Sequence, residues 1–591
     1  MGEILQEALT RREFFRTVLG AAVVLGTPVW LDRAARGATG DSGVRFIPVG
    51  LSRKDRIGVP AGYLTQVVVR WGDPVTADAP LFDPRRQTAE AQARQFGCNC
   101  DFVTFLPLPR GSRAAGHGLL WVNHEYTDPE LMFFEYPAGR PTREMVDVEL
   151  AAHGGTIVEV RQAPDGSWTH LRGSRYNRRI TGETPCLLTG PAAGHAWMHT
   201  REDPTGLRVR GTLSNCAGGK TPWGTVLTCE ENFHQYFASA AQLPADDPRV
   251  RMHARYGIPR GPSERRWELY HERFDVSREP NEPFRFGWVV EVDPYDPTFV
   301  PRKRTALGRF KHEGATVVVS RDGRVVVYSG DDERFEYVYK FVSSKPYRAG
   351  DRAHNLTLLD EGTLYVARFY PDGSGEWLPL VFGHGPLTPE NGFGSQADVL
   401  LNARGAADLL EATRMDRPED IEAHPLTGTV YVVCTNNGWR TATQVDPANP
   451  RAVNRHGHVL ELFEAGGDHA ATRFRWQIFL LSGQPHLRSR REPLDRHGRA
   501  AGRLGVQRRP LRDARVGTGA GPGPTIPQRP HRMRGVRPGV HPGLPHALRG
   551  HPAPGGGQHA PAGLQPVAGR YRPPRPAVVA VRHREGREIG T

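Results

Sequence analysis

Short apolar runs, most of which begin at or just after a glycine, recur along the chain between about residue 40 and residue 480. Within each run the residues alternate or stay apolar for a few positions, as they do in β-strands, and Gly, Pro, Asp and Asn separate the runs. Clear examples are 118–122, 155–160, 287–292, 323–328, 362–366, 428–433 and 457–462. Helix is expected only locally, near 88–95 and 406–412. The pattern therefore predicts an all-β fold.

The repetition of these strand units, without long helices between them, indicates a β-propeller over residues 40–480. In several units a tight turn leads into a strand, as in the sequence Asp-Gly-Arg-Val-Val-Val-Tyr at 322–328. Because the spacing of the units is irregular, a β-sandwich stays open as the alternative.

The first 39 residues have the features of an export signal. Arg11 and Arg12 stand side by side before the short apolar run 18–26, which is too short to span a membrane comfortably. We predict a twin-arginine signal peptide at 1–39, recognition by the twin-arginine export machinery, and a periplasmic or extracellular protein with no stable membrane span after processing. The alternative is a cytosolic amphipathic start. Six cysteines are few for an exported protein, so a disulfide framework is not expected to be the main source of stability.

The basic charge of the chain is concentrated in one segment. A formal charge of +13 would favour a nucleic-acid partner if it were spread over a folded face. Residues 481–570, however, contain 16 Arg, no Lys and 3 acidic residues, and the rest of the chain has 61 basic and 61 acidic residues. We therefore expect no nucleic-acid partner.

The same segment, 481–570, contains no Phe, Trp, Tyr, Cys, Asn or Lys and is dense in Arg, Pro, Gly and His. Such a composition is typical of a disordered basic tail. It is also what a GC-rich gene yields when it is read in a shifted frame. Ordinary composition resumes at Tyr571, and 576–582 has the pattern of a strand. Our hypothesis is that a compensated frameshift has replaced one propeller blade, and that 571–591 supplies the terminal strand.

A thiol and two adjacent carboxylates stand close together between residues 215 and 232. Cys216 precedes Gly218-Gly219 and Pro222, which are turn formers, so we expect it on a loop. The strand 224–229 then delivers Glu230 and Glu231 at its end. A thiolate and carboxylates repel one another unless a cation lies between them. The alternative is a buried cysteine beside a solvated pair of carboxylates.

Four further clusters place acidic residues next to predicted strands. They are Asn123-His124-Glu125, Lys311-His312-Glu313, Asp331-Asp332-Glu333, and Asp416-Arg417-Pro418-Glu419-Asp420. In a propeller, strand ends meet at the rim of the central channel. So many oxygen ligands suit calcium, and a thiolate or an imidazole makes room for a transition metal. Arg417 among the carboxylates indicates a fork for an anion such as phosphate. Each cluster alone is also compatible with solvated loop charge.

Taken together, these segments resemble the PhoX class of secreted, calcium-dependent alkaline phosphatases. The resemblance covers most of the chain from about 45 to 480, and 576–590 is similar to the final strand of that family. It implies a six-bladed propeller that holds two ferric ions and several calcium ions around a bridging oxygen. It also implies that Cys216 is an iron ligand, that Glu313 and Glu419 are carboxylate ligands of the metals, and that Arg417 holds phosphate. Glu230, Asp331 and Asp332 match family motifs and are expected as further metal ligands.

The expected function is metal-dependent hydrolysis of phosphate monoesters for phosphate acquisition, with Arg417 and Glu419 as catalytic residues and small phosphate esters as substrates. One alternative is a propeller hydrolase of another ester, such as a lactone or a phosphodiester. Another is an inactive or repurposed calcium-binding propeller. The family has a further acidic ligand and blade-closing strands where this chain has 484–570. A protein made as written is therefore expected to fold poorly and to have little activity.

Overall fold

The computed structural model describes residues 49–53, 57–113, 115–137, 139–481 and 575–583. The predicted signal peptide at 1–39 lies outside the described residues. So does the segment predicted to be aberrant, 481–570, apart from its first residue.

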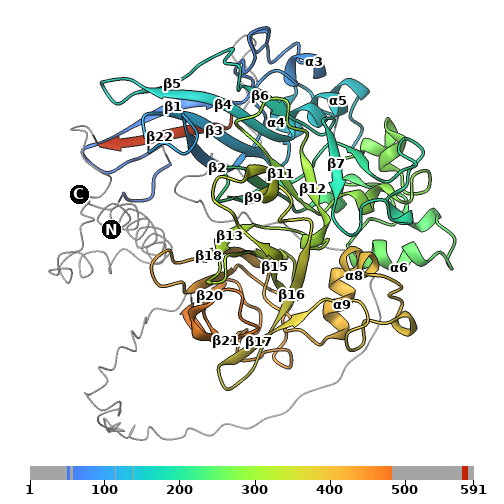
Figure 1. The fold of residues 1–591 in the computed structure, drawn as a ribbon. Coiled ribbons are helices and arrows are strands. Elements are labelled where there is room, and N and C mark those ends of the chain that lie inside the picture. Colours follow the sequence, from blue (N-terminus) through green and yellow to red (C-terminus); the bar gives the residue numbers. More distant parts are fainter. Residues whose placement is uncertain (1–48, 54–56, 114, 138, 482–574, 584–591) are drawn as a thin grey trace, which may run out of the picture.

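Four antiparallel units of four consecutive strands form most of the described chain (Figure 1). The first unit is β2 (Cys100–Pro107), β3 (His117–His124), β4 (Gly154–Gln162) and β5 (Trp168–His170), and the second is β9 (Asn215–Lys220), β10 (Val226–Glu230), β11 (Val289–Val292) and β12 (Arg302–Arg304). The third is β13 (Thr316–Val319), β14 (Arg324–Gly330), β15 (Val338–Pro346) and β16 (Gly362–Phe369), and the fourth is β18 (Pro418–Ala423), β19 (Val430–Cys434), β20 (His458–Glu464) and β21 (Arg473–Leu481). Each unit is an up-and-down sheet that could form one propeller blade.

The remaining strands extend or join these units. β6 (Arg178–Ile180) pairs with β4, while β7 (Pro185–Thr189) and β8 (Arg208–Arg210) extend the second unit beyond β12. β17 (Ser374–Pro379) pairs with both β16 and β21, so the third and fourth units form one nine-stranded sheet.

The helices are short and lie in the connections. They are α3 (Ala89–Gln92), α4 (Pro129–Met132), α5 (Arg143–Ala152), α6 (Pro248–Arg255), α7 (Arg352–Asn355), α8 (Gln396–Leu401) and α9 (Ala403–Leu409). α3 and α9 fall where the sequence predicted local helix. Among the described residues, no helix has the length and apolar character needed to cross a membrane.

The first strand of each unit lies next to the first strand of the neighbouring unit. β9 contacts both β2 and β13, and β18 contacts β13. The four first strands are therefore the innermost strands around a shared axis, which is the arrangement of a β-propeller. The predicted all-β propeller is confirmed, and the β-sandwich alternative is not.

Two segments from opposite ends of the chain form a further sheet. β1 (Tyr63–Arg70) pairs antiparallel with β22 (Ala577–His583), and Trp71 donates its backbone N–H to the carbonyl of Pro576 at 2.8 Å. Such pairing of the terminal strands closes a ring of blades. The number of six blades stays a prediction, because 482–574, between β21 and β22, lie outside the described residues.

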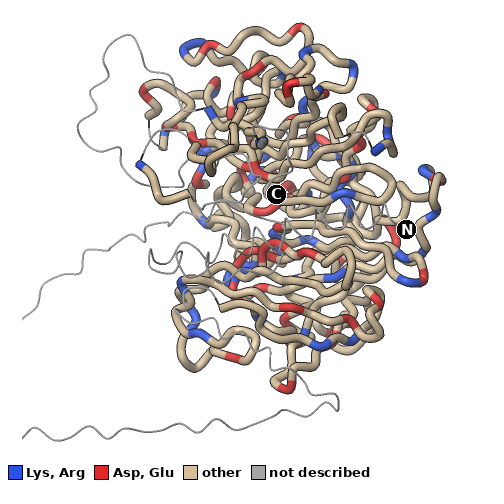
Figure 2. Tube along the Cα trace, turned by 90° about the vertical axis from the view of Figure 1, so that its left-hand side faces the viewer, with Lys and Arg blue, Asp and Glu red and all other residues tan. Residues whose placement is uncertain are grey.

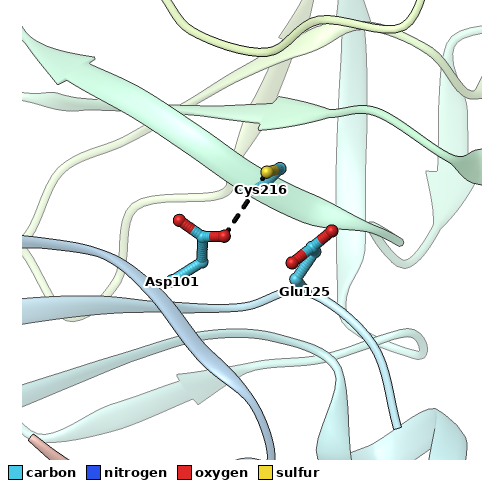
Figure 3. A group of neighbouring side chains, drawn as sticks. All are labelled: Asp101, Glu125 and Cys216. Atoms are coloured by element: carbon cyan, nitrogen blue, oxygen red, sulfur yellow. Dashed lines mark hydrogen bonds between the residues drawn. The ribbon is translucent and has the colours of Figure 1, made fainter. Parts of the chain in front are cut away.

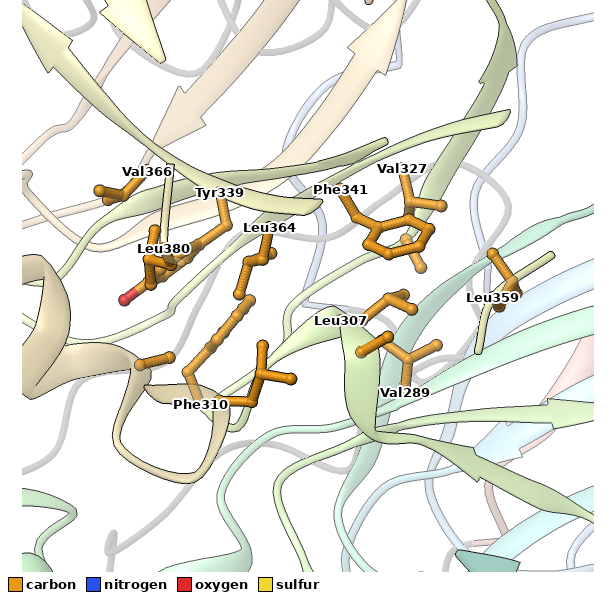
Figure 4. Close-up of a cluster of buried hydrophobic side chains, with 14 of the residues drawn as sticks. Val289, Leu307, Phe310, Val327, Tyr339, Phe341, Leu359, Leu364, Val366 and Leu380 are labelled. Carbon is orange, nitrogen blue, oxygen red and sulfur yellow. The ribbon is translucent and has the colours of Figure 1, made fainter. Parts of the chain in front are cut away.

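A large apolar cluster fills the space between the second and third units (Figure 4). Val289 of β11 faces Val327 of β14 and Phe341 of β15 across this cluster, and the rings of Phe310 and Tyr339 stack with their centroids 4.1 Å apart. Burial of each such side chain contributes about 1.5–3 kcal/mol to folding. This packing fixes β9 and β13 relative to each other, and the candidate site lies at the start of those strands.

Candidate metal centre

The residues at the start of the innermost strands include several of the predicted metal ligands. Asp101, Cys216 and Glu419 are each the second residue of an innermost strand, namely β2, β9 and β18, and Glu313 lies three residues before the first residue of β13. Equivalent positions on neighbouring blades converge at one end of the central channel. Cys216 is therefore within a strand and not on a loop, so that expectation was wrong.

The reason that Cys216 can lie in a strand is the glycine pair that follows it. A Cβ at Gly219 would lie 1.9 Å from the carbonyl oxygen of Ala315, and a Cβ at Gly218 would lie 2.3 Å from that of Leu227. Glycine lets β9 approach its neighbours more closely than any side chain would permit. A Gly-Gly sequence usually favours a turn, but in β9 it allows close contact between strands.

The thiol of Cys216 lies between carboxylates (Figure 3). Its Sγ is 3.4 Å from Oδ2 of Asp101 and 3.2 Å from Oε1 of Glu313. Two groups of three side chains each bring their ligand atoms within 4.8 Å of one another. The first is Asp101, Glu125 and Cys216, and the second is Cys216, Glu231 and Glu313. Cys216 belongs to both, so it is the centre of the site.

Asn123 holds this end of β9 in place. Its amide group donates to the carbonyl oxygens of Cys216 and Ala217, the latter at 3.1 Å. Its side-chain oxygen accepts from Trp121 Nε1 at 2.7 Å and from the Thr228 hydroxyl at 2.8 Å. One buried amide thus links β3, β9 and β10 directly behind the thiol.

The buried carboxylates interact strongly with one another. Burial raises the pKa of Glu313 well above its ordinary value, and the neighbouring Glu231 and Glu419 raise it further. Burial and Asp332 raise the pKa of Glu419 to about 8. Burial, followed by Asp101, raises the pKa of the Cys216 thiol. A set of acids in this state is costly to ionise unless cations neutralise it.

Among the described residues, few cations lie at this site. Arg417 lies 2.6 Å from Oδ2 of Asp332 and 3.5 Å from Oε1 of Glu419. Lys311 lies 2.8 Å from Oε2 of Glu333. Arg417 also has a φ of 51°, in the left-handed region that a non-glycine residue adopts only at a cost. The contacts with Asp332 and Glu419 hold its guanidinium beside the acids.

Glu230 and Asp331 have other partners. Glu230 accepts from Lys303 Nζ at 2.7 Å and from the backbone N–H groups of Gly287 and Trp288. Asp331 accepts from Arg404, whose Nε is 2.8 Å away. Both carboxylates are neutralised by protein cations, and the metal-ligand role expected for them stays a prediction.

Four carboxylates at this site were not among the predicted ligands. Asp101, Glu125, Glu231 and Asp420 all contribute to the electrostatics of the cluster. Successive residues along an extended segment point to opposite sides, so Glu230, the last residue of β10, pairs with Lys303, while Glu231, the next residue, lies beside Cys216 and Glu313. Asp101 could have been found by comparing the second positions of the innermost strands, but β2 itself was not among the predicted runs.

The donor set suits metal ions. Oδ1 of Asp332 is buried and has no hydrogen-bond partner among the described residues, although Oδ2 binds Arg417. Carboxylate oxygens prefer hard cations such as calcium, and the addition of a thiolate favours a transition metal. Figure 2 shows acidic positions close together near the middle of the view, among charges that are otherwise scattered along the chain. The residues present therefore fit a centre with more than one cation.

Comparison with known proteins gives a consistent result. Residues 44–501 match a family model described as alkaline phosphatase PhoX. Among solved structures, the chain is similar to Pseudomonas fluorescens PhoX in complex with vanadate, a transition state analogue, with 42% sequence identity and a TM-score of 0.71. That match covers 75% of this chain and 77% of the other. A search of curated proteins found no match.

Proposed function

Because the chain belongs to the PhoX alkaline phosphatase family, we propose that it hydrolyses phosphate monoesters at the centre around Cys216. The family assignment confirms the resemblance seen in the sequence. The observation that carries the proposal is the meeting of one thiol with Asp101, Glu125, Glu231 and Glu313 within 4.8 Å, in two overlapping groups.

The proposed cofactors are ferric iron and calcium. Cys216, with Glu313 and Glu419, would hold iron and its neighbours, while the surrounding carboxylates, Asp332 among them, would hold calcium. When bound, such cations neutralise the negative charge of the phosphoryl group and activate the attacking oxygen. The raised pKa values of Glu313 and Glu419 support this assignment, since a cation is what would keep both carboxylates ionised.

Arg417 is the proposed phosphate-binding residue. Its guanidinium is about one quarter exposed, while the carboxylates of Asp332 and Glu419 hold it from behind. A guanidinium fixed in this way can donate two parallel hydrogen bonds to a phosphoryl group. Those bonds strengthen as negative charge develops in the transition state, so Arg417 would stabilise that state more than the bound substrate.

The proposal includes export by the twin-arginine route and a role in phosphate acquisition outside the cytoplasm. Arg11 and Arg12 before the apolar run 18–26 support it. A fusion of residues 1–39 to a reporter enzyme tests it. Export that is lost when Arg11 and Arg12 are both changed to Lys is the expected result, and export that persists contradicts this part of the proposal.

A second candidate function comes from the unusual composition of 481–570. If those residues replace a blade and an acidic ligand of the family, the protein would be an inactive or repurposed calcium-binding propeller, or a hydrolase of another ester. The centre around Cys216 favours phosphatase activity, because neither a purely structural calcium site nor a lactonase needs a thiol beside a phosphate-binding arginine.

Hydrolysis of 4-nitrophenyl phosphate by the purified full chain tests the proposed function. We expect a low activity that is lost after treatment with a chelator and restored by calcium. Glu419→Gln should lower kcat by about a hundredfold or more, since it removes a ligand and a partner of Arg417 at once. Glu422→Gln, on the same strand, is the matched control and should retain activity. Full activity of Glu419→Gln would refute the assignment.

A further inference from the structure

A cavity lies at the end of the innermost strands that is opposite the metal centre. Its volume is about 420 Å³, within the range of sites for small molecules. Lys220, the last residue of β9, is on its wall. Lys220 is four residues beyond Cys216, which is about 13 Å at the rise of a β-strand. The cavity is therefore separate from the metal centre, although both use β9.

Among the described residues, this cavity is lined by cations and by no carboxylates. Its described lining includes Arg110, Lys220 and Arg352, but no Asp or Glu. Arg352 forms an ion pair with Asp293, which is buried. Arg110 has no ion-pair partner among the described residues, and its charge, after burial, lowers the pKa of Arg352. The described lining of the cavity thus has positively charged side chains and no negatively charged ones.

Aromatic rings form the walls between the cations. The ring centroids of Trp223 and Tyr347 are 6.4 Å apart in a stacked arrangement. The hydroxyl of Tyr295 donates to the carbonyl oxygen of Pro107 at 3.0 Å, and Trp223 Nε1 donates to Glu291 at 2.8 Å. Because protein groups already satisfy the polar atoms of Trp223 and Tyr295, these two rings are fixed and present apolar surface to the cavity.

The two kinds of group are held close to each other. Arg352 donates to the carbonyl oxygen of Trp223 at 3.0 Å. A Cβ added at Gly224 would lie 3.6 Å from Cδ of Arg110 and 3.5 Å from the ring of Tyr295, so the stem of Arg110 lies over this turn beside that ring. An anionic group bound by the guanidinium groups would therefore place an attached ring against the aromatic walls.

We propose that this cavity binds a small aromatic anion, a planar ring bearing a phosphate or carboxylate group, independently of the metal centre. The guanidinium and ammonium groups bind the anion, and the fixed rings bind the planar part. Little side-chain freedom is lost on binding, because Trp223, Tyr295 and Arg352 are held by the protein before the ligand arrives.

Titration calorimetry of the purified full chain with phenylphosphonate tests this proposal. Phenylphosphonate has no phosphate ester bond, so hydrolysis does not consume it. The double variant Arg110→Ala/Lys220→Ala should bind it at the cavity at least tenfold more weakly, while its hydrolysis of 4-nitrophenyl phosphate stays as in the wild type. The double variant Arg161→Ala/Arg175→Ala, which removes two exposed cations elsewhere, is the matched control and should bind like the wild type.

Two results would overturn the proposal. One is unchanged binding by Arg110→Ala/Lys220→Ala. The other is a single binding event in the wild type that disappears in Glu419→Gln, which would assign all binding to the metal centre. Inorganic phosphate alone tests the role of the rings. We expect it to bind the cavity at least tenfold more weakly than phenylphosphonate, and equal affinity would refute aromatic recognition.

Discussion

Glu230, the last residue of β10, and Glu231, which follows it, show how adjacent residues can have different roles. Glu230 is buried against Lys303, whereas Glu231 lies with Cys216 and Glu313 in the candidate metal centre. The sequence presents them as an equivalent pair. Only the direction of β10 in the folded protein decides which of the two faces the channel, and that direction depends on packing around Val226 and Leu227 that local sequence does not encode.

Because of this difference, replacing each glutamate with glutamine should have a different effect. Glu230→Gln leaves the charge of Lys303 buried without its partner, so we expect a loss of about 3–5 kcal/mol of stability in chemical unfolding. Glu231→Gln should change stability much less in chelator-treated protein but should lower the bound calcium. If Glu230→Gln folded as stably as the wild type while losing metal, Glu230 would be the ligand after all.

Arg417 gives a second test at this scale. Arg417→Ala removes charge-assisted hydrogen bonds to the phosphoryl group, so kcat/KM should fall by about a hundredfold or more. Arg414→Ala is the control, because Arg414 is an exposed arginine that pairs with Asp408 six residues earlier in the chain. Steady-state kinetics with 4-nitrophenyl phosphate compare the two variants. Equal kcat/KM for Arg417→Ala and the wild type would exclude a role in phosphate binding.

The raised pKa of Glu419 predicts how the metal-free protein responds to pH. In the folded protein this pKa is about 8, above the ordinary value of 4.5. The folded state therefore holds a proton that the unfolded chain releases, and stability falls as pH rises from about 4.5 to about 8. We expect the Tm of chelator-treated protein to be lower at pH 8 than at pH 5, with a smaller drop in Glu419→Gln. Calcium should restore the Tm at pH 8, and a Tm that rises with pH in the chelator would contradict the assignment.

At the scale of elements, the sequence predicted the outer strands better than the innermost ones. The runs at 118–122, 155–160, 323–328 and 428–433 became β3, β4, β14 and β19, because their apolar residues are buried in the cores between blades. β2 and β9 were missed. β9 contains Asn215 and a glycine pair and few apolar residues, so it lacks the apolar pattern of a strand. β2 is mostly apolar, with Asp101 at its start, and was missed although its sequence carries that pattern.

A substitution in the glycine pair tests whether β9 needs glycine for its close contact with β13. Gly219→Ala would place a methyl group 1.9 Å from the carbonyl oxygen of Ala315, and backbone must move to accept it. We expect a loss of about 1–3 kcal/mol or more in stability and reduced metal content. Gly261→Ala is the control, since a Cβ there meets nothing within 4 Å. Chemical unfolding measures both variants. A neutral Gly219→Ala would mean that β9 and β13 are not in close contact.

At the scale of the whole molecule, the pairing of β1 with β22 joins the two ends of the described chain. The pairing runs from Tyr63 with His583 to Arg70 with Ala577. The sequence indicated a strand at 576–582, but its partner could not be inferred, because the two strands are separated by about 500 residues and local patterns carry no information on distant pairing.

Truncation tests this closure. A chain that ends at residue 574 lacks β22 and should unfold at a lower temperature, since β1 loses its hydrogen-bonding partner. A chain that ends at residue 583 keeps β22 and is the matched control. Thermal unfolding of both proteins is the measurement. Equal Tm values would show that β22 does not contribute to the stability of the fold.

The frameshift hypothesis also belongs to the whole molecule. Fresh DNA sequence across codons 475–580 should show one base missing or extra near each end of the aberrant segment. The restored protein is then expected to gain activity and stability. An unbroken, confirmed frame would instead favour the second candidate function, an inactive or repurposed propeller.

The central claim is that a metal centre built on Cys216 makes this propeller a phosphatase. Elemental analysis of the purified full chain, its Cys216→Ala variant and its Cys186→Ala variant tests that claim most directly. Cys186 is also buried, but it lies in a separate apolar cluster and therefore controls for the loss of a buried thiol. We expect bound iron and calcium in the wild type and in Cys186→Ala, and no bound iron in Cys216→Ala. Iron bound equally by all three proteins, or absent from all of them, would contradict it.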